Sequence, residues 1–264
     1  MNWNKYYSVL LVFLMLLAHN IKLEAAEKIT VGFGDALAPW VITKSDDGII
    51  IDIIEHALAP LGYEIEKVYL PYARRLKSYK QGLLDVVSDI NESTMTEKNL
   101  QGFLSDTAYT YINYAYSLKN RNYQLKSMQD LANYRLLSWQ GAVAHLGGKY
   151  ADMAYNNPLY SEHHDQSLQV KMLYLERVDV IQMDEQIFNY YRSKVGSQGD
   201  IDTSPEVDRF GFFGESPNGF LFRNLKIRDQ FNQQLAKLRS SGKYQEIVNK
   251  YFLPAANDSD NNSN

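Results

Sequence analysis

The sequence predicts an α/β fold with mainly parallel strands, arranged in two successive sets. Strand-like stretches with alternating apolar residues are separated by stretches with apolar residues at helical spacing, which is typical of parallel strands joined by helices. A long strand-like stretch lies in the middle of the chain, and a second strand and helix series follows it. The 264 residues, 45% of them hydrophobic, are enough for one large domain or two small ones.

The first set reads as three strands and two helices. Residues 29–33 alternate apolar with small or polar residues, as a strand with one buried face does. Residues 52–55 match an acidic helix start, and Pro60 and Gly62 predict the end of that helix. The other expected elements are strands over 65–70 and 83–90 and a helix over 72–81.

The middle of the chain predicts a long strand over residues 109–118, rich in tyrosine, that crosses into the second set. The elements expected after it are a helix start at Ser127, strands over 136–139, 178–183 and 220–222, and helices over 143–155, 168–175, from Asp184, 227–238 and 244–252. The polar tail after Pro254 is expected to be disordered.

Residues 1–26 are predicted to be a cleavable secretory signal. Lys5 and the amino terminus supply a positive start, and residues 9–18 form an unbroken apolar run. Such a run is too short for the ~30 Å hydrocarbon core, which takes about 20 residues. Cleavage is expected after Ala25 or Ala26, and a retained membrane anchor is the alternative. The expected location is the periplasm.

Composition narrows the classes of partner and chemistry. The net charge is −4, from 27 Lys and Arg against 31 Asp and Glu, and this argues against nucleic acid or anionic lipid as a partner. The absence of cysteine excludes disulfides, thiol catalysis, thiolate metal sites and a lipoprotein anchor. Adjacent side chains diverge, so His163-His164-Asp165 does not predict a metal site. We expect neither a metal nor a cofactor.

Five segments, in order, carry a resemblance to a known family. They are Asp47-Gly48 leading to Asp52, Pro71-Tyr72-Ala73-Arg74, Thr96-Glu97-Lys98 before Phe103-Leu104-Ser105-Asp106, Glu176-Arg177-Val178-Asp179 before Asp184, and Ser241-Gly242-Lys243-Tyr244 with Tyr251-Phe252. With these segments, residues 29–252 resemble the family 3 solute-binding proteins of ABC transporters, which have the type II periplasmic binding fold.

The resemblance implies two α/β lobes joined by two hinge crossovers, with the ligand between them. Lobe 1 would comprise residues 27–111 and 209–253, and lobe 2 residues 112–208, followed by a disordered tail over 254–264. Helix N-termini with free N–H groups would line the cleft, and hinge closure would bury the solute.

The resemblance also implies site residues, most of them with a structural alternative. Lys98 falls where amino-acid receptors carry the arginine that binds the ligand carboxylate, and its alternative is a solvated surface lysine. Asp184 falls at the acidic position for the ligand ammonium, and its alternative is a helix N-cap. Trp40 is expected to stack on the solute or else pack in the core. Tyr72 and Arg74 begin a helix near the same cleft.

Two further groups complete the expected site. Gln140, Gly141 and Ala142 lie between a strand and a helix, where backbone N–H groups would face the ligand and Gly141 would permit close approach. Asp89 and Glu92 lie at the end of a strand in lobe 1. If either faces the cleft, it favours a cationic solute.

Three functions remain open at this stage. The leading one is a monomeric, non-enzymatic receptor that captures an amino acid or similar small polar solute and delivers it to an ABC permease. The second is a sensing module for a membrane signalling protein. The third is an enzyme resembling cyclohexadienyl dehydratases, which would need a carboxylate of raised pKa among Asp89, Glu92 and Asp184.

Overall fold

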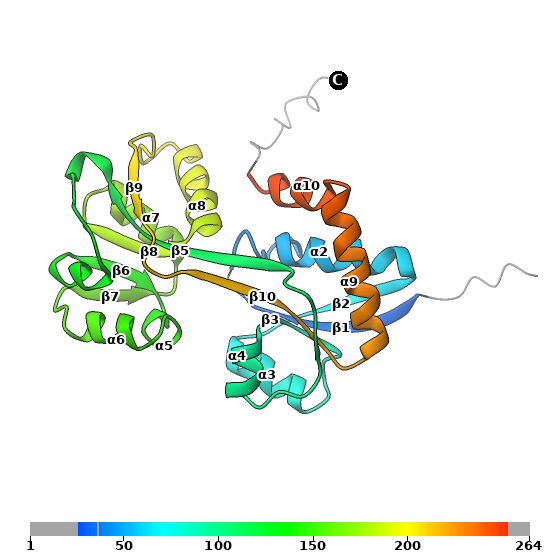
Figure 1. The fold of residues 1–264 in the computed structure, drawn as a ribbon. Coiled ribbons are helices and arrows are strands. Elements are labelled where there is room, and N and C mark those ends of the chain that lie inside the picture. Colours follow the sequence, from blue (N-terminus) through cyan, green and yellow to red (C-terminus); the bar gives the residue numbers. More distant parts are fainter. Residues whose placement is uncertain (1–25, 36, 253–264) are drawn as a thin grey trace, which may run out of the picture.

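The computed structural model describes residues 26–35 and 37–252. They form two lobes connected by two long strands, β5 (Tyr109–Leu118) and β10 (Glu215–Phe222) (Figure 1). The expected tail, and the expected signal peptide apart from Ala26, lie outside the described residues. Within residues 26–252, apart from residue 36, no helix has the length and apolar composition that a membrane span needs.

Lobe 1 is built on three parallel strands. β1 (Glu27–Phe33) lies between β2 (Tyr63–Tyr69) and β3 (Val86–Ile90), and β10 runs antiparallel beside β3. The short β4 (Phe103–Leu104) pairs with β10. The helical segments of lobe 1 are α2 (Ile49–Leu58), η1 (Ala59–Leu61), α3 (Tyr72–Lys80), α4 (Glu92–Glu97), α9 (Leu225–Ser240) and α10 (Lys243–Lys250).

Lobe 2 repeats this arrangement. β6 (Leu136–Trp139) lies between β7 (Tyr160–His163) and β8 (Val180–Asp184), all parallel, and β5 runs antiparallel beside β8. β9 (Val207–Phe210) pairs with β5. The helical segments of lobe 2 are η2 (Lys119–Arg121), η3 (Met128–Asn133), α5 (Ala142–His145), α6 (Gly148–Tyr155), α7 (Gln166–Tyr174) and α8 (Glu185–Ser197). The predicted fold class, two lobes with mainly parallel sheets, is confirmed.

One strand path runs through both lobes, in the order β2-β1-β3-β10-β5-β8-β6-β7. The change of lobe occurs within β5. Its first residues, Tyr109 to Ile112, pair with β10, and the next, Asn113 to Tyr116, pair with β8. The lobe boundaries at residues 111 and 209 themselves stay predictions.

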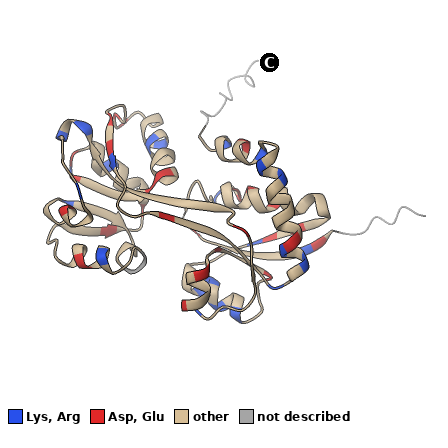
Figure 2. Ribbon diagram, viewed as in Figure 1, with Lys and Arg blue, Asp and Glu red and all other residues tan. Residues whose placement is uncertain are grey.

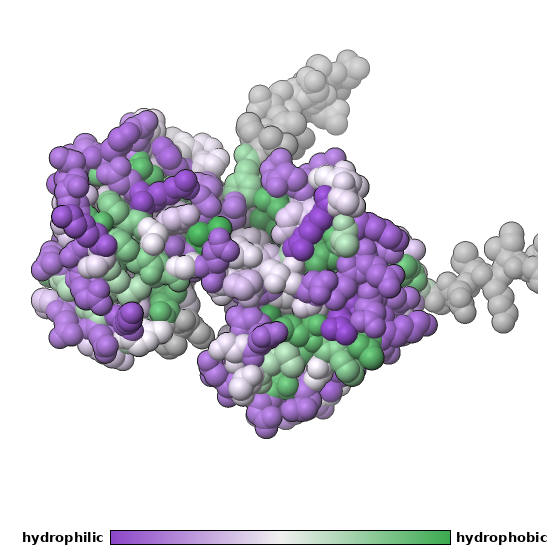
Figure 3. Space-filling model, viewed as in Figure 1, coloured by the Kyte–Doolittle hydropathy of each residue, from purple (hydrophilic) through white to green (hydrophobic). Residues whose placement is uncertain are grey.

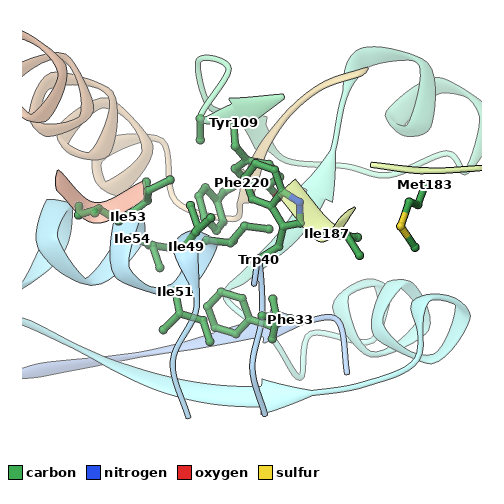
Figure 4. Packing of buried hydrophobic residues seen from close by; sticks show 14 of the residues in the cluster. Phe33, Trp40, Ile49, Ile51, Ile53, Ile54, Tyr109, Met183, Ile187 and Phe220 are labelled. Carbon is green, nitrogen blue, oxygen red and sulfur yellow. The ribbon is translucent and has the colours of Figure 1, made fainter. Parts of the chain in front are cut away.

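The main core lies where α2 packs on the sheet of lobe 1. Five isoleucines of α2 are fully buried in one cluster with Phe33 of β1, and Figure 4 shows Ile51 beside Phe33. Burying one such side chain contributes roughly 1.5–3 kcal/mol before the entropy cost of ordering it. This packing holds the carboxyl end of β1, and the loop that follows it, at a fixed place.

Two helix predictions are corrected by the structure. The helix expected to begin at Asp52 begins at Ile49, because Gly48 with φ 143° ends the preceding loop. Asp52 then lies inside the helix, where its Oδ2 accepts hydrogen bonds from Lys250 Nζ and Tyr251 OH, both at 2.8 Å. The helix expected over 143–155 is two helices, α5 and α6, separated at Gly147 (φ 88°).

Charged side chains of both signs are interspersed over the two lobes (Figure 2). In Figure 2 the Lys and Arg positions of the ribbon occur in short stretches spread over both lobes. This distribution fits the slightly acidic net charge of the sequence.

Candidate functional site

The carboxyl ends of β3, β6 and β8 lead into helices α4, α5 and α8. In open α/β sheets, ligands bind beyond the carboxyl ends of the parallel strands. In Figure 1, α5 of lobe 2 lies on the side that faces α4 of lobe 1, and Figure 3 shows an indentation between the lobes there. The side chains at these strand ends therefore define the candidate site.

Asp184 ends β8 and is the N-cap of α8, as the capping alternative predicted. Its Oδ1 accepts hydrogen bonds from Trp40 Nε1 at 2.8 Å, Gln186 N at 3.0 Å and Ile187 N at 3.2 Å. Its Oδ2 accepts one from Ile112 N at 2.9 Å. Only 4% of the residue is exposed. Burial raises the pKa of Asp184 to about 6, although the four N–H groups oppose that rise.

Trp40 reaches Asp184 from the other lobe. Its backbone is fixed at the start of α2, since Ile50 N donates to the Trp40 carbonyl at 3.0 Å. Its ring packs edge-on against Tyr111, with centroids 5.0 Å apart, and lies 5.7 Å from Tyr109. Figure 4 shows Trp40 beside Tyr109 and Phe220, with Ile187 of α8 nearby. Trp40 thus belongs to the core and also contacts lobe 2.

Arg75, not the predicted Arg74, supplies a guanidinium to this region. Arg75 is 2% exposed, and its Nη1 lies 2.8 Å from Asp89 Oδ2 and 3.2 Å from Ser88 Oγ. Its Nε is buried and has no hydrogen-bond partner among the residues that the structure describes. Arg74, one residue earlier on α3, is exposed. The helix therefore turns the first arginine to solvent and the second toward the end of β3.

Asp89 collects several hydrogen bonds besides the ion pair. Tyr111 OH donates to Oδ1 at 2.6 Å and Tyr109 OH donates to it at 3.1 Å, while Ser88 Oγ donates to Oδ2 at 3.0 Å. Its backbone has φ 61°, which a residue with a Cβ adopts only at a cost of order 1–3 kcal/mol. Burial and the Asp89 carboxylate raise the pKa of both tyrosines well above the usual 10. Both phenols therefore remain protonated donors.

Two glycines, Gly32 of β1 and Gly34 directly after it, make room for the Arg75 side chain. A Cβ at Gly32 would lie 3.2 Å from Arg75 Cγ and 2.6 Å from Leu84 Cδ1. A Cβ at Gly34 would lie 3.2 Å from Arg75 Nη1. The close approach of side chain to strand explains why glycine occupies both positions.

The backbone N–H groups predicted to face a ligand are bound within the chain. Glu162, on β7, accepts from Gly141 N at 2.8 Å and from Val143 N at 3.0 Å. Tyr160 OH donates to the same carboxylate at 2.8 Å. Gly141 has φ 100°, so glycine is required there for the turn itself. The N-terminus of α5 is thus satisfied by a carboxylate of its own lobe.

The predicted site residues differ in exposure and in their distance from the strand ends. Trp40, Tyr72, Asp89 and Asp184 lie buried or half-buried around the strand ends, with the Tyr72 ring 5.5 Å from the Arg75 guanidinium carbon. Arg74, Lys98 and Gln140 are exposed, as is Glu92. Gly141 is half-buried and Ala142 is fully buried. All nine assignments as ligand-binding residues stay predictions.

Sequence reasoning missed Arg75, Tyr109, Tyr111 and Glu162. A signal for Arg75 was present, because Arg75, Leu76 and Tyr79 share one face of α3 and all three are buried. For Glu162 the signal was absent, since β7 is four residues long and carries no strong alternation. In the described part of the chain, no group of three or more His, Asp or Glu side chains is arranged to hold a metal ion.

The sequence comparisons assign the family. Residues 29–254 match the model of the bacterial extracellular solute-binding proteins, family 3. The chain belongs to this family. No curated protein matches its sequence.

Solved structures share the fold at low sequence identity. The GluR0 ligand-binding core in complex with L-glutamate superimposes with a TM-score of 0.67 at 14% identity, over 87% of this chain and 100% of that one. An ancestral arginine-binding protein bound to arginine gives 0.63 at 20% identity, over 87% and 100%. A histidine kinase sensor domain with similarity to periplasmic binding proteins gives 0.61 at 14% identity, over 86% and 97%.

Proposed function

We propose that this chain is a periplasmic receptor that captures a small polar solute between its lobes by hinge closure and hands it to an ABC importer. The solute is an amino acid or a similar compound, as in the glutamate- and arginine-bound structures of the same fold. The observation that carries the proposal is the hydrogen bond between Trp40 of lobe 1 and Asp184 of lobe 2, at the carboxyl ends of the sheet strands.

That contact suits a hinged receptor because it joins two lobes that β5 and β10 also connect. A polar solute entering at the strand ends would exchange its own donors with those that Asp184 and Asp89 now accept. Domain closure around a ligand needs such exchangeable contacts on both sides of the hinge.

Binding, rather than catalysis, fits the carboxylates. A general acid needs a proton within reach of the substrate. The pKa of Asp184 is raised, but its two oxygens accept four N–H groups, and Asp89 pairs with a guanidinium. Both carboxylates therefore act here as hydrogen-bond acceptors, as solute binding requires.

The second candidate is a sensing module that presents its solute to a membrane signalling protein. The observation in its favour is the shared fold with a histidine kinase sensor domain. Pull-down of the solute-loaded chain with the membrane fraction separates the two candidates, since the captured partner is a permease in one case and a signalling protein in the other.

The test of solute capture is a thermal-shift screen of the chain from Glu27 onward, unfolded and refolded to remove bound compounds. The panel holds amino acids, polyamines, small organic acids and oligosaccharides. A solute at 100 times its Kd adds about 2.7 kcal/mol, or roughly 5–10 °C at this size. A response confined to one chemical class supports capture, and a flat screen contradicts it.

A matched pair of variants tests the site. Asp184 and Asp165 are both N-caps in lobe 2, and only Asp184 bonds to lobe 1. Asp184→Asn should weaken solute binding by about 1.5–3 kcal/mol, whereas Asp165→Asn should leave the affinity for the solute unchanged. Equal affinities in both folded variants would remove Asp184 from the site. Lys98→Ala tests the sequence-based assignment of Lys98 in the same assay.

A further inference from the structure

The expected charge of the solute follows from which charged and polar groups near the site already have partners within the chain. A guanidinium and backbone N–H groups at a helix start are the groups that bind carboxylates and other anions. Here Arg75 already pairs with Asp89, and the N–H groups of Gly141 and Val143 already bind Glu162. Each of these anion-binding groups therefore has a carboxylate from its own lobe.

A positively charged group of a solute, in contrast, would find a carboxylate whose present partners are uncharged. Asp184 accepts its hydrogen bonds from Trp40, Ile112, Gln186 and Ile187, all through N–H groups that carry no charge. Three of these are backbone groups, and the indole N–H alone belongs to a side chain. An ammonium in its place would give the carboxylate a charged partner and a stronger hydrogen bond.

The pairing of Arg75 with Asp89 is enforced by its surroundings. Asp89 keeps φ 61°, and two tyrosine hydroxyls and Ser88 Oγ hold its carboxylate. Within the described part of the chain, Arg75 Nε is buried without a hydrogen-bond partner. Strain and an unsatisfied donor of this kind persist where surrounding structure requires one arrangement, and they cluster at ligand sites.

From this geometry we infer that Asp89 is a specificity-determining residue. By neutralising Arg75, it selects a solute that carries an amine and has no free carboxylate. This inference rests on the proposed function and narrows its solute class from amino acids to small amines and amino-acid amides.

The test compares matched pairs of compounds by calorimetric titration of the refolded chain from Glu27 onward. The pairs are L-arginine and agmatine, L-lysine and cadaverine, and L-phenylalanine and phenethylamine, each an amino acid and its decarboxylated amine. In at least one pair the amine should bind at least about tenfold more tightly than its amino acid. A tenfold ratio of affinities corresponds to the contribution of one hydrogen bond to a charged group.

Asp89→Asn frees the guanidinium of Arg75 and keeps the size of the side chain. It should raise affinity for the amino acid of that pair about tenfold and reduce the preference for the amine. Asp85→Asn is the matched control, because Asp85 directly precedes the same strand and is exposed, and its carboxylate accepts only the Thr30 N–H among the described contacts. It should leave the preference unchanged.

The outcomes separate the inference from the proposed function. Tighter binding of an amino acid than of its amine by the unmodified chain overturns the inference and keeps solute capture. So does a response confined to sugars or organic acids in the thermal-shift screen. If folded Asp89→Asn prefers the amine over the amino acid as strongly as the unmodified chain does, Asp89 is not the cause of that preference. Absence of binding by every compound in the screen contradicts the proposed function, and the inference with it.

Discussion

The two lobes place an aspartate at corresponding strand ends and treat it in opposite ways. β3 and β8 hold the same position in their sheets, each between the central parallel strand and the antiparallel one. Asp89 of β3 is held by a guanidinium and hydroxyls at φ 61°, whereas Asp184 of β8 is held by four N–H groups in an ordinary extended conformation. Neighbours, not residue type, decide whether such a carboxylate accepts uncharged N–H groups or neutralises an arginine.

The largest expected effect breaks the ion pair of lobe 1. Arg75→Met leaves the Asp89 carboxylate buried without its cation and should lower the free energy of unfolding by about 3–5 kcal/mol, measured by urea denaturation. Arg74→Met is the matched control on the same helix. Because Arg74 is exposed, its loss should change stability by no more than about 0.5 kcal/mol. Equal effects of the two substitutions would show that the buried pair contributes little.

The next effect removes the contact between the lobes. Trp40→Phe keeps an aromatic ring against Tyr111 and deletes the indole N–H that bonds to Asp184. A hydrogen bond to a charged, buried acceptor contributes about 1.5–3 kcal/mol, so the unfolding free energy should fall by that amount at pH 7.5. A loss below about 0.5 kcal/mol would mean that this bond does not couple the lobes.

A smaller effect sharpens the comparison through pH. The pKa of Asp184 is raised to about 6 by burial, so its protonated form is favoured by folding. The stabilisation is complete below the unfolded pKa near 3.9 and is lost as pH rises through 6. Relative to Asp184→Asn, the unmodified chain should therefore gain about 2 kcal/mol between pH 7.5 and pH 4.5.

For Asp165, the N-cap of α7, stability should depend on pH in the opposite direction in the same experiment. Its pKa is lowered, with Ser167 and Leu168 providing the hydrogen bonds that outweigh its burial. Its stabilisation is present above the unfolded pKa and is lost as pH falls through the folded one. The difference between the unmodified chain and Asp165→Asn should thus shrink on acidification. A parallel response of the two aspartates would contradict the assigned environments.

Local patterns predicted the fold well because its elements obey local rules. The long strand β5 and the short strand β6 have the predicted bounds, and Asp184 caps α8 as expected. The wrong predictions concern helix bounds, which Gly48 and Gly147 set. Asp52 matches a helix start in sequence, yet it lies inside α2 because Gly48 begins the helix earlier and Tyr251 supplies its partner.

The candidate site was harder to predict because its pairs are far apart in sequence. Asp89 and Trp40 were named, but their partners Tyr111 and Asp184 lie 22 and 144 residues away. Choosing Arg74 over Arg75 followed the motif, whereas the helical spacing of Arg75, Leu76 and Tyr79 marks the buried face. Motifs locate such a site, and side-chain direction within an element decides which residue enters it.

The central claim is that a solute is captured between two lobes that move on binding. The chain has no cysteine, so spin labels on Gln81→Cys and Lys149→Cys, exposed positions in lobe 1 and lobe 2, report a single interlobe distance. Pulsed electron resonance should show that a saturating solute from the screen shifts this distance to a shorter, narrower distribution. An unchanged distribution, with the solute bound, would contradict capture by closure of the lobes.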